Sequence, residues 1–412
     1  MSRFTGIIGI IIILGLAFLW SNNRKAINLR LVITGLLLQL ALAIFILKVP
    51  VGQNIFAWLG KVINKLLDFS QEGGLFVFGD LTKVSEILPP AIVSGGVFLF
   101  TLLPTIIFVC VLVAMAYHVG IMQRIVAVLA RFMHWVMRVS GSEALSNVAS
   151  AFVGQVEAQI MIRPYLSGMT MSELLASMTG SMACIAGGVM AVYISMGVPA
   201  SYLLAASLMA APGALVISKI VFPETQESET KGVVKIEVKK EQTNIMDAIS
   251  HGASDGMAIS INVIAMLIGV IALVALVDAL LGYFGLFLGW TGLSLDFIGL
   301  DVNSLRLKDV FGAFFSLFAI VMGVPVAESF EVGSLMGTKM VINEFVAYSD
   351  LAPMIQQGAL SPKSIVIASF ALCGFANFSS IAIQLGGIGA MVPSRKADLA
   401  RLGFKAMICG TM

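Results

Sequence analysis

The chain alternates long apolar runs with short polar connections. Each long run has about 20 apolar residues, the length that a helix needs to cross about 30 Å of hydrocarbon. The runs cover residues 4–20, 31–49, 92–117, 174–196, 203–222, 258–281 and 365–385. A last run starts near Leu402 and stops at Met412, so we expect a half-span or a truncated span there. The pattern predicts an all-α membrane protein with about eight transmembrane helices.

Two other segments are amphipathic. Residues 121–139 place Arg124, Arg131 and Arg138 among isoleucine, valine, leucine, phenylalanine and tryptophan, and residues 55–69 show a weaker version of this pattern. Such segments are typical of helices that lie in the membrane interface. For residues 121–139, a long cytoplasmic extension of the preceding span is the alternative.

Composition and charge refine this picture. Hydrophobic residues make up 58% of the chain and charged residues 12%, which excludes an ordinary soluble domain. Lysine and arginine cluster at residues 24–30, 124–138 and 395–401, and such clusters favour the cytoplasmic side. The N-terminus is then expected outside. The polar stretch 223–246 is predicted to be a flexible cytoplasmic linker between two halves.

Two stretches are too polar and too broken for ordinary spans. Residues 150–164 contain Glu157 with one glycine and two glutamines, and residues 322–348 contain Glu328, Glu331 and Glu344. A carboxylate at membrane depth costs several kcal/mol unless it faces a cavity, is protonated or is paired. Glu157 and Glu344 are therefore the leading functional candidates, and Glu157 is expected to be buried. Glu331 fits a solvated loop equally well.

Each broken stretch is followed by an apolar helix with small and polar residues in its middle, at residues 180–189 and 374–382. One such pair in each half predicts an inverted repeat with two re-entrant helical hairpins and a site at the membrane midplane. Asn377 and Ser380 are three residues apart and would share one helix face. They could bind a ligand together or hold two helices together.

Other chemistry is weakly represented. The four cysteines lack metal-ligand spacing, the three histidines lie near segment ends, and no hydrolase, kinase or dinucleotide motif is present. We therefore expect no cofactor, no nucleic-acid partner and no metal beyond, at most, a weak sodium site. An enzyme acting within the membrane is a weak alternative.

The motif Gly337-Thr-Lys339-Met-Val-Ile-Asn343-Glu344-Phe-Val-Ala-Tyr348 resembles in full the signature Gly-x-Lys-x-x-x-Asn-Glu-Phe-Val-Ala-Tyr of the concentrative nucleoside transporters. Gly154-Gln155-Val156-Glu157 and Gly374-Phe375-Ala-Asn377-Phe-Ser-Ser380 support the resemblance, which extends over essentially the whole chain.

The resemblance implies a homotrimer in a bacterial inner membrane, in which a mobile transport domain moves a nucleoside past a fixed scaffold by an elevator motion. Scaffold helices would comprise residues 1–120, and a scaffold span with its connecting segment residues 258–309. The transport domain would comprise residues 121–222 and 310–412, and residues 223–257 would form the linker with an interfacial helix. The lipid bilayer is the other expected partner.

Roles for individual residues also follow from the resemblance. The base would meet Gln155 and Glu157, and a carboxylate, an amide and a hydroxyl would hold the ribose. The remaining expected substrate-binding residues are the apolar walls Val189, Ile259 and Phe375 and the ribose ligands Glu344, Asn377 and Ser380.

The expected coupling site departs from the family pattern. Sodium-coupled members carry asparagine where this chain has Ser150 and serine where it has Cys184, while Val153 and Ile185 offer only backbone carbonyls. Because sodium prefers oxygen ligands, these changes weaken a sodium site. Proton coupling with Glu157 as carrier is favoured, and sodium coupling is the alternative. Val156 replaces the usual threonine or serine, which leaves base preference open.

One further reading comes from another functional class. A channel or nucleoside-gated receptor could use the same pocket without a cation-driven cycle. Accumulation of substrate against a gradient would distinguish transport from both.

Overall fold

The computed structural model describes residues 5–79, 81, 98–230, 242–291 and 305–412, and the regular structure in these residues is helical throughout. Four described helical segments are long and apolar enough to cross a membrane, or five if the bent pair α6 and α7 forms one crossing. They are Leu29–Leu47, Met171–Ser195, Ala200–Val221 and Ile271–Trp290. Shorter apolar helices account for other predicted spans. The chain is therefore an all-α membrane protein, as predicted.

Residues 231–241 of the predicted linker lie outside the described residues. The helices before this stretch are α1 (Thr5–Leu19), η1 (Arg24–Ala26), α2 (Leu29–Leu47), α3 (Pro50–Phe78), α6 (Phe98–Val119), α7 (Ile121–Met137), α8 (Gly141–Ser150), α9 (Glu157–Ile160), η3 (Arg163–Tyr165), α10 (Met171–Ala183), α11 (Gly187–Ser195) and α12 (Ala200–Val221). Those after it are α13 (Ile245–Trp290), α14 (Leu307–Met322), η6 (Val326–Glu328), α15 (Ser329–Val341), α16 (Glu344–Gln356), α17 (Pro362–Ala371), α18 (Phe378–Met391), η7 (Pro393–Arg395) and α19 (Lys396–Thr411).

α7 is a separate amphipathic helix, as its pattern predicted. The chain turns by 75° between α6 and α7, and Gly120 makes this turn with a φ of 84°. Val126 and Ala130 are buried on one face of α7, while Trp135 on the other face is exposed. The sharp turn excludes a straight extension of the preceding span.

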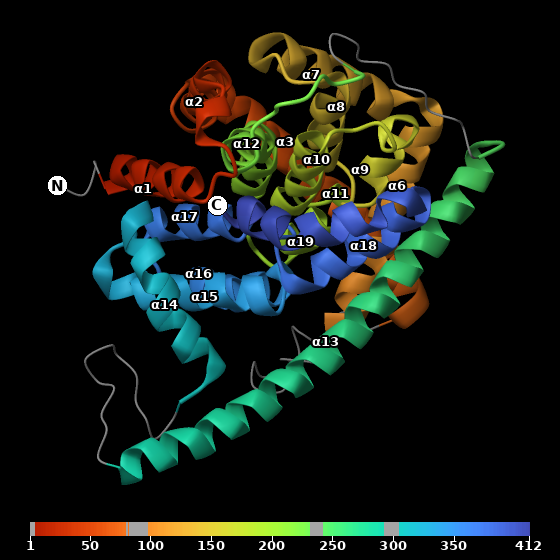
Figure 1. Cartoon of the computed structure of the whole chain (residues 1–412). Helices are drawn as coiled ribbons and strands as arrows, with labels where there is room; N and C mark the ends of the chain where they lie inside the picture. Colours follow the sequence, from red (N-terminus) through yellow and green to blue (C-terminus); the bar gives the residue numbers. More distant parts are fainter. Residues whose placement is uncertain (1–4, 80, 82–97, 231–241, 292–304) are drawn as a thin grey trace.

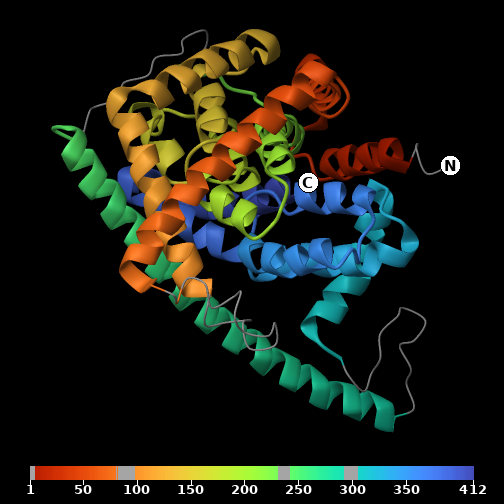
Figure 2. The ribbon, with the colours of Figure 1, turned by 180° about the vertical axis from the view of Figure 1, so that it is seen from behind.

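α3 and α13 are longer than their patterns predicted. α3 has 29 residues and includes the whole segment 55–69. α13 runs without a break for 46 residues, so the residues before 258 that were expected to form a separate interfacial helix are the first part of one long helix. Asn244 caps the start of α13, and no proline follows to interrupt it. Figures 1 and 2 show α13 along one side of the bundle and extending beyond it.

Two predicted spans are each broken in the middle. Residues 184–186 separate α10 from α11, and residues 372–377 separate α17 from α18. Gly374 adopts a φ of 105° in the second break, a conformation that a side chain would disfavour. The prediction of continuous helices over 174–196 and 365–385 is therefore wrong at the positions where small and polar residues gather.

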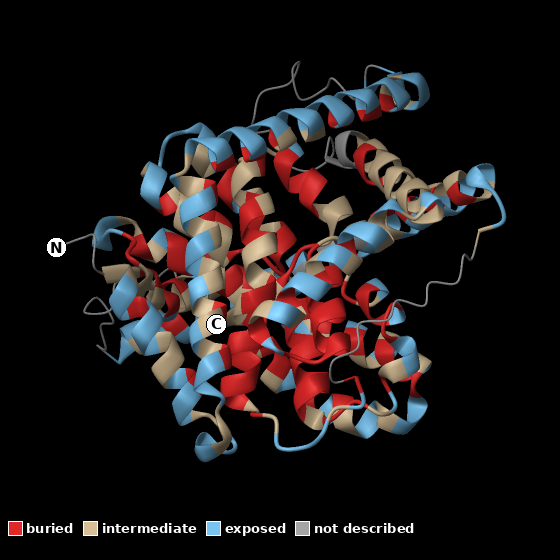
Figure 3. Cartoon of the chain, turned by 90° about the horizontal axis from the view of Figure 1, so that it is seen from above, coloured by how far each residue is buried: buried red, intermediate tan, exposed pale blue. Residues whose placement is uncertain are grey.

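The breaks pack against each other and against the loop at residues 151–156. A Cβ on Gly374 would fall on the carbonyl oxygens of Met182 and Ala183, so the second break touches the end of α10. The amide of Gly187 donates to the Phe152 carbonyl at 3.1 Å. Figure 3 shows buried residues concentrated in the middle of the bundle and exposed residues along its outer helices. Many of these exposed residues are large and apolar.

Candidate functional site

Glu344 connects the two halves of the chain. It is the first residue of α16 and is 5% exposed. Its carboxylate accepts hydrogen bonds from the Tyr193 hydroxyl on α11 and from the Asn377 amide before α18, both at 3.1 Å. Two neutral donors and the start of a helix stabilise a negative charge at this position.

Asn377 does not lie within a helix, so the predicted shared helix face with Ser380 is wrong. It is the residue that caps α18, and its Oδ1 accepts from the Ser380 backbone amide at 2.9 Å. The two residues still meet, because a capping side chain bonds the amide three residues later. The Ser380 hydroxyl in turn lies 3.4 Å from Nε2 of Gln155.

Gln155 completes this polar chain from the loop between α8 and α9. Its Oε1 is buried and has no hydrogen-bond partner within the described residues. A buried acceptor without a partner is costly, which makes a donor on a bound ligand favourable there. The structure thus brings together four of the predicted substrate residues, namely Gln155, Glu344, Asn377 and Ser380.

Aromatic and aliphatic side chains border the polar chain. Val189, Ile259 and Phe375 are half-buried and pack against the same apolar cluster. That cluster contains Tyr193 and Tyr348, whose rings stack with centroids 4.4 Å apart. The three predicted wall residues, which are far apart in the sequence, therefore pack against one hydrophobic cluster.

Glu157 is exposed, whereas the sequence predicted a buried carboxylate. The reason is local, because Glu157 begins the four-residue helix α9, and its carboxylate folds back over Gly154, where a side chain would collide with it. Glu157 interacts electrostatically with Cys110 and Tyr117 of α6. It is not joined by any described hydrogen bond to Glu344, Asn377 or Ser380.

The predicted coupling residues Ser150, Val153, Cys184 and Ile185 are all buried. The Ser150 hydroxyl donates to the Ser146 carbonyl at 2.8 Å and lies 3.0 Å from the Ser181 hydroxyl. The Cys184 thiol lies 3.8 Å from the Ser207 carbonyl. Within the described residues, no group of three or more histidine, cysteine or acidic side chains could hold a metal ion.

Sequence reasoning missed the partners of Gln159. This side chain is fully buried, and its amide donates to the hydroxyls of Ser146 at 3.0 Å and Ser181 at 2.5 Å. Its Oε1 accepts from Ser177 at 2.6 Å. A glutamine in the broken stretch was visible, but its serine partners on α8 and α10 emerge only from the fold.

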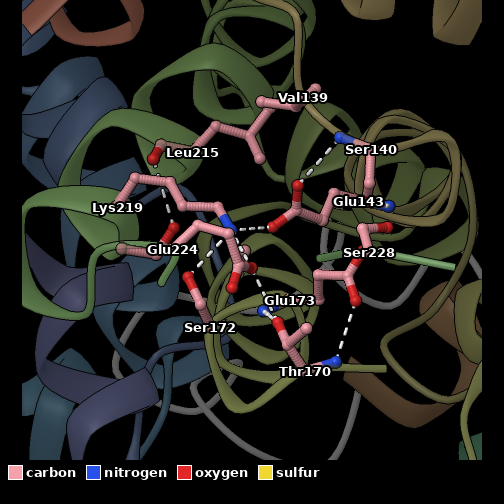
Figure 4. A network of polar contacts seen from close by, with 12 residues as sticks. Val139, Ser140, Glu143, Thr170, Ser172, Glu173, Leu215, Lys219, Glu224 and Ser228 are labelled. Carbon is pink, nitrogen blue, oxygen red and sulfur yellow. Dashed lines mark hydrogen bonds and ion pairs between the residues drawn. The ribbon is translucent and has the colours of Figure 1, made fainter. Parts of the chain in front are cut away.

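A second polar network lies away from this site, around Lys219 of α12 (Figure 4). Lys219 forms ion pairs with Glu143 and, at 3.3 Å, with Glu224, and it donates to Ser172 at 2.8 Å. Glu143 and Glu173 also close capping boxes at the starts of α8 and α10. The spacing Ser/Thr-x-x-Glu before each helix is the sequence signal that could have found these caps.

Glu224 belongs to this network and follows the end of α12. Burial opposes its charge, but the Lys219 ammonium and the Thr170 hydroxyl hold the pKa of Glu224 below its ordinary value. Thr170 donates to this carboxylate at 2.7 Å. The network therefore ties the segment after α12 to the first turn of α10.

Three family models match the chain in sequence. The C-terminal model of the Na+ dependent nucleoside transporters matches residues 202–412, and the N-terminal model matches residues 8–81. A model described as "nucleoside recognition" (Gate) matches residues 99–200.

Several curated proteins are similar over the whole chain. The uncharacterized transporter YutK of Bacillus subtilis is 41% identical over 100% of this chain and 97% of its own length. The nucleoside permease NupC of Helicobacter pylori is 35% identical over 100% of this chain and 95% of its own. The sodium/nucleoside cotransporter 2 of Rattus norvegicus is 37% identical over 100% of this chain and 60% of its own.

Solved structures agree in fold. CNTnw in an inward-facing substrate-bound state is 40% identical, covers 100% of this chain and 95% of its own, and gives a TM-score of 0.90. A variant of CNTnw in an outward-facing state is 39% identical with the same coverage and gives 0.89. The chain belongs to the concentrative nucleoside transporter family and is therefore a transporter, not an enzyme.

Proposed function

We propose that this protein imports nucleosides by cation-coupled alternating access, with the substrate held between Gln155 and Glu344. The observation that carries the proposal is the polar chain Glu344–Asn377–Ser380–Gln155, which joins both halves through described hydrogen bonds. It lies beside the two helix breaks, where uncompensated backbone groups and small residues favour ligand binding.

The chemistry of these groups suits a nucleoside. The Glu344 carboxylate is an acceptor for the vicinal hydroxyls of a ribose, and Tyr193 and Asn377 hold it in place. The free Oε1 of Gln155 is an acceptor for an N–H group of a base. Val189, Ile259 and Phe375 would then contact the faces of the base.

Proton coupling is our preferred mode. The Ser150 hydroxyl is bonded to Ser146 and Ser181, and the Cys184 thiol is a poor sodium ligand. Glu157, exposed at the start of α9, is the proposed proton carrier. Sodium coupling remains the second candidate, because two matching family models describe Na+ dependent transporters.

The membrane arrangement is part of the proposal. We propose a multi-pass protein of a bacterial inner membrane with the N-terminus outside, assembled as a homotrimer whose transport domain moves like an elevator. The exposed apolar side chains Trp58 and Phe69 of α3 and Leu276 and Phe287 of α13 support contact with lipid or neighbouring subunits. The Lys219 network would then face the cytoplasm.

Uptake of labelled uridine and adenosine into proteoliposomes tests the proposal. A pH gradient or a sodium gradient is imposed separately, and Glu157→Gln is measured beside the unchanged protein. We expect accumulation above equilibrium with a pH gradient alone and its loss in the variant. Accumulation with a sodium gradient alone would show that sodium, and not the proton, is the coupling ion. Equilibration without accumulation would favour a channel or receptor.

A further inference from the structure

Lys339 is a buried lysine that lies outside the polar chain of the candidate site, although its charge interacts with that of Glu344. It lies on α15, is 2% exposed, and donates to the carbonyl oxygens of Ala371 at 3.2 Å and Cys373 at 3.3 Å. These acceptors are backbone carbonyls, not carboxylates. Lysine is rarely buried to this degree, so a favourable electrostatic interaction must offset the cost of burying its charge.

This interaction is with the backbone carbonyls at the end of α17. Ala371 is the last residue of that helix, and Cys373 lies in the break before α18. The end of a helix carries unpaired carbonyls and a partial negative charge, and a break inside the bundle separates these carbonyls from water. The Lys339 ammonium supplies both a positive charge and the missing donors.

The equivalent end in the first half has no such lysine contact among its described partners. α10 ends at Ala183, and the carbonyls of Met182 and Ala183 lie against Gly374 of the second break. Two negative helix ends therefore meet at one crossing. The Ser181 hydroxyl, two residues before the end of α10, is neutral and lies 3.0 Å from the Ser150 hydroxyl.

We propose that Lys339 is a tethered cation, whose charge and N–H donors hold the second helix break in place. This role at the end of α17 does not depend on which ion is coupled to transport. Lys339 is thus a positioning residue, which acts on Phe375 and Asn377 through the break that carries them.

Rescue by a small cation tests this role. Lys339→Ala leaves a space that methylammonium can enter, whereas Lys339→Met removes the charge and fills the space. We would measure Tm and uridine binding of both purified variants in detergent at constant pH and ionic strength, with methylammonium or the larger choline as the cation. Detergent is chosen because methylammonium would dissipate a pH gradient across vesicles.

We expect Lys339→Ala to lose several degrees in Tm and more than about tenfold in binding, as when one partner of a buried charge contact is removed. Methylammonium should restore both in Lys339→Ala, but not in Lys339→Met, and choline should restore neither. Wild-type Tm and binding in Lys339→Met, or an equal or absent response of both variants to methylammonium, would overturn the proposal.

Lys339→Arg keeps the inference testable if the alanine variant does not fold. It should retain a higher Tm than Lys339→Met, and equal values for these two variants would contradict a role for the charge. Because Tm needs neither nucleoside nor ion gradient, a failure of this inference is separable from a failure of the transport proposal.

Discussion

At the scale of residues, the Glu344 carboxylate is where the polar contacts of the two halves of the chain meet. Glu344 meets Asn377 and Tyr193, and Asn377 leads through Ser380 to Gln155. Residue type and motif predicted Glu344, Asn377, Ser380 and Gln155 as site residues. The contact of Tyr193 with Glu344 is visible only in the structure. The burial of Glu157 was predicted from its apolar neighbours in sequence, and this failed because a four-residue helix gives it no covering surface.

Two substitutions test the interpretation of the coupling residues. Ser150→Asn together with Cys184→Ser restores the amide and hydroxyl oxygens of the sodium-coupled family members, next to the Ser181 hydroxyl. Because sodium binds oxygen ligands best, uridine uptake should become stimulated by sodium at constant pH. Replacement of sodium by choline is the control. Unchanged sodium dependence in the double variant would refute the assignment of these positions.

Glu224 predicts a pH effect on stability. The folded-state pKa of Glu224 lies below its ordinary value of 4.5, so its contribution is present above pH 4.5 and is lost as pH falls through the folded value. Glu224→Gln should therefore lower Tm most at neutral pH. The difference in Tm from the unchanged protein should shrink below pH 4.5. A difference that grows on acidification would contradict a stabilising role of the Glu224 charge.

At the scale of elements, hydrophobic periodicity located the helices but not their ends. The breaks in 174–196 and 365–385 were hidden because the arms on both sides are apolar and each break has only three or six residues. The 46-residue α13 was divided in the prediction because its first part is polar. Backbone signals carry the missing information, above all Gly374 and the caps Asn343 and Asn377.

Gly374→Ala tests whether the second break is required. The φ of 105° disfavours any side chain, and a Cβ would collide with the carbonyl oxygens that end α10. We expect a large fall in Tm and loss of uptake. Gly358→Ala is the matched control, since Gly358 has a φ of 64° and open space around its Cβ position. Equal small effects of both substitutions would show that the contact with α10 is unimportant.

At the scale of the whole molecule, the sequence correctly predicted the helical membrane class and the family, while the division into halves by a polar linker stays a prediction. The sequence could not predict that the two breaks cross, because the contact between Gly374 and the end of α10 joins residues nearly two hundred positions apart. The Lys219 network could not be predicted from the sequence either. Its members Glu143, Ser172, Lys219 and Glu224 are distributed over α8, α10, α12 and the segment that follows.

Binding of uridine and its deoxy analogues to purified protein tests the central claim, that Glu344 is the acceptor for ribose hydroxyls. Glu344→Gln keeps the size of the side chain but replaces the anionic acceptor. The unchanged protein should bind uridine more tightly than 2′-deoxyuridine and 3′-deoxyuridine, and the variant should lose about tenfold or more for uridine, equivalent to about 1.4 kcal/mol. It should also discriminate less between the three ligands. Unaltered affinity and discrimination in Glu344→Gln, with an unchanged Tm, would place the ribose elsewhere and contradict this site.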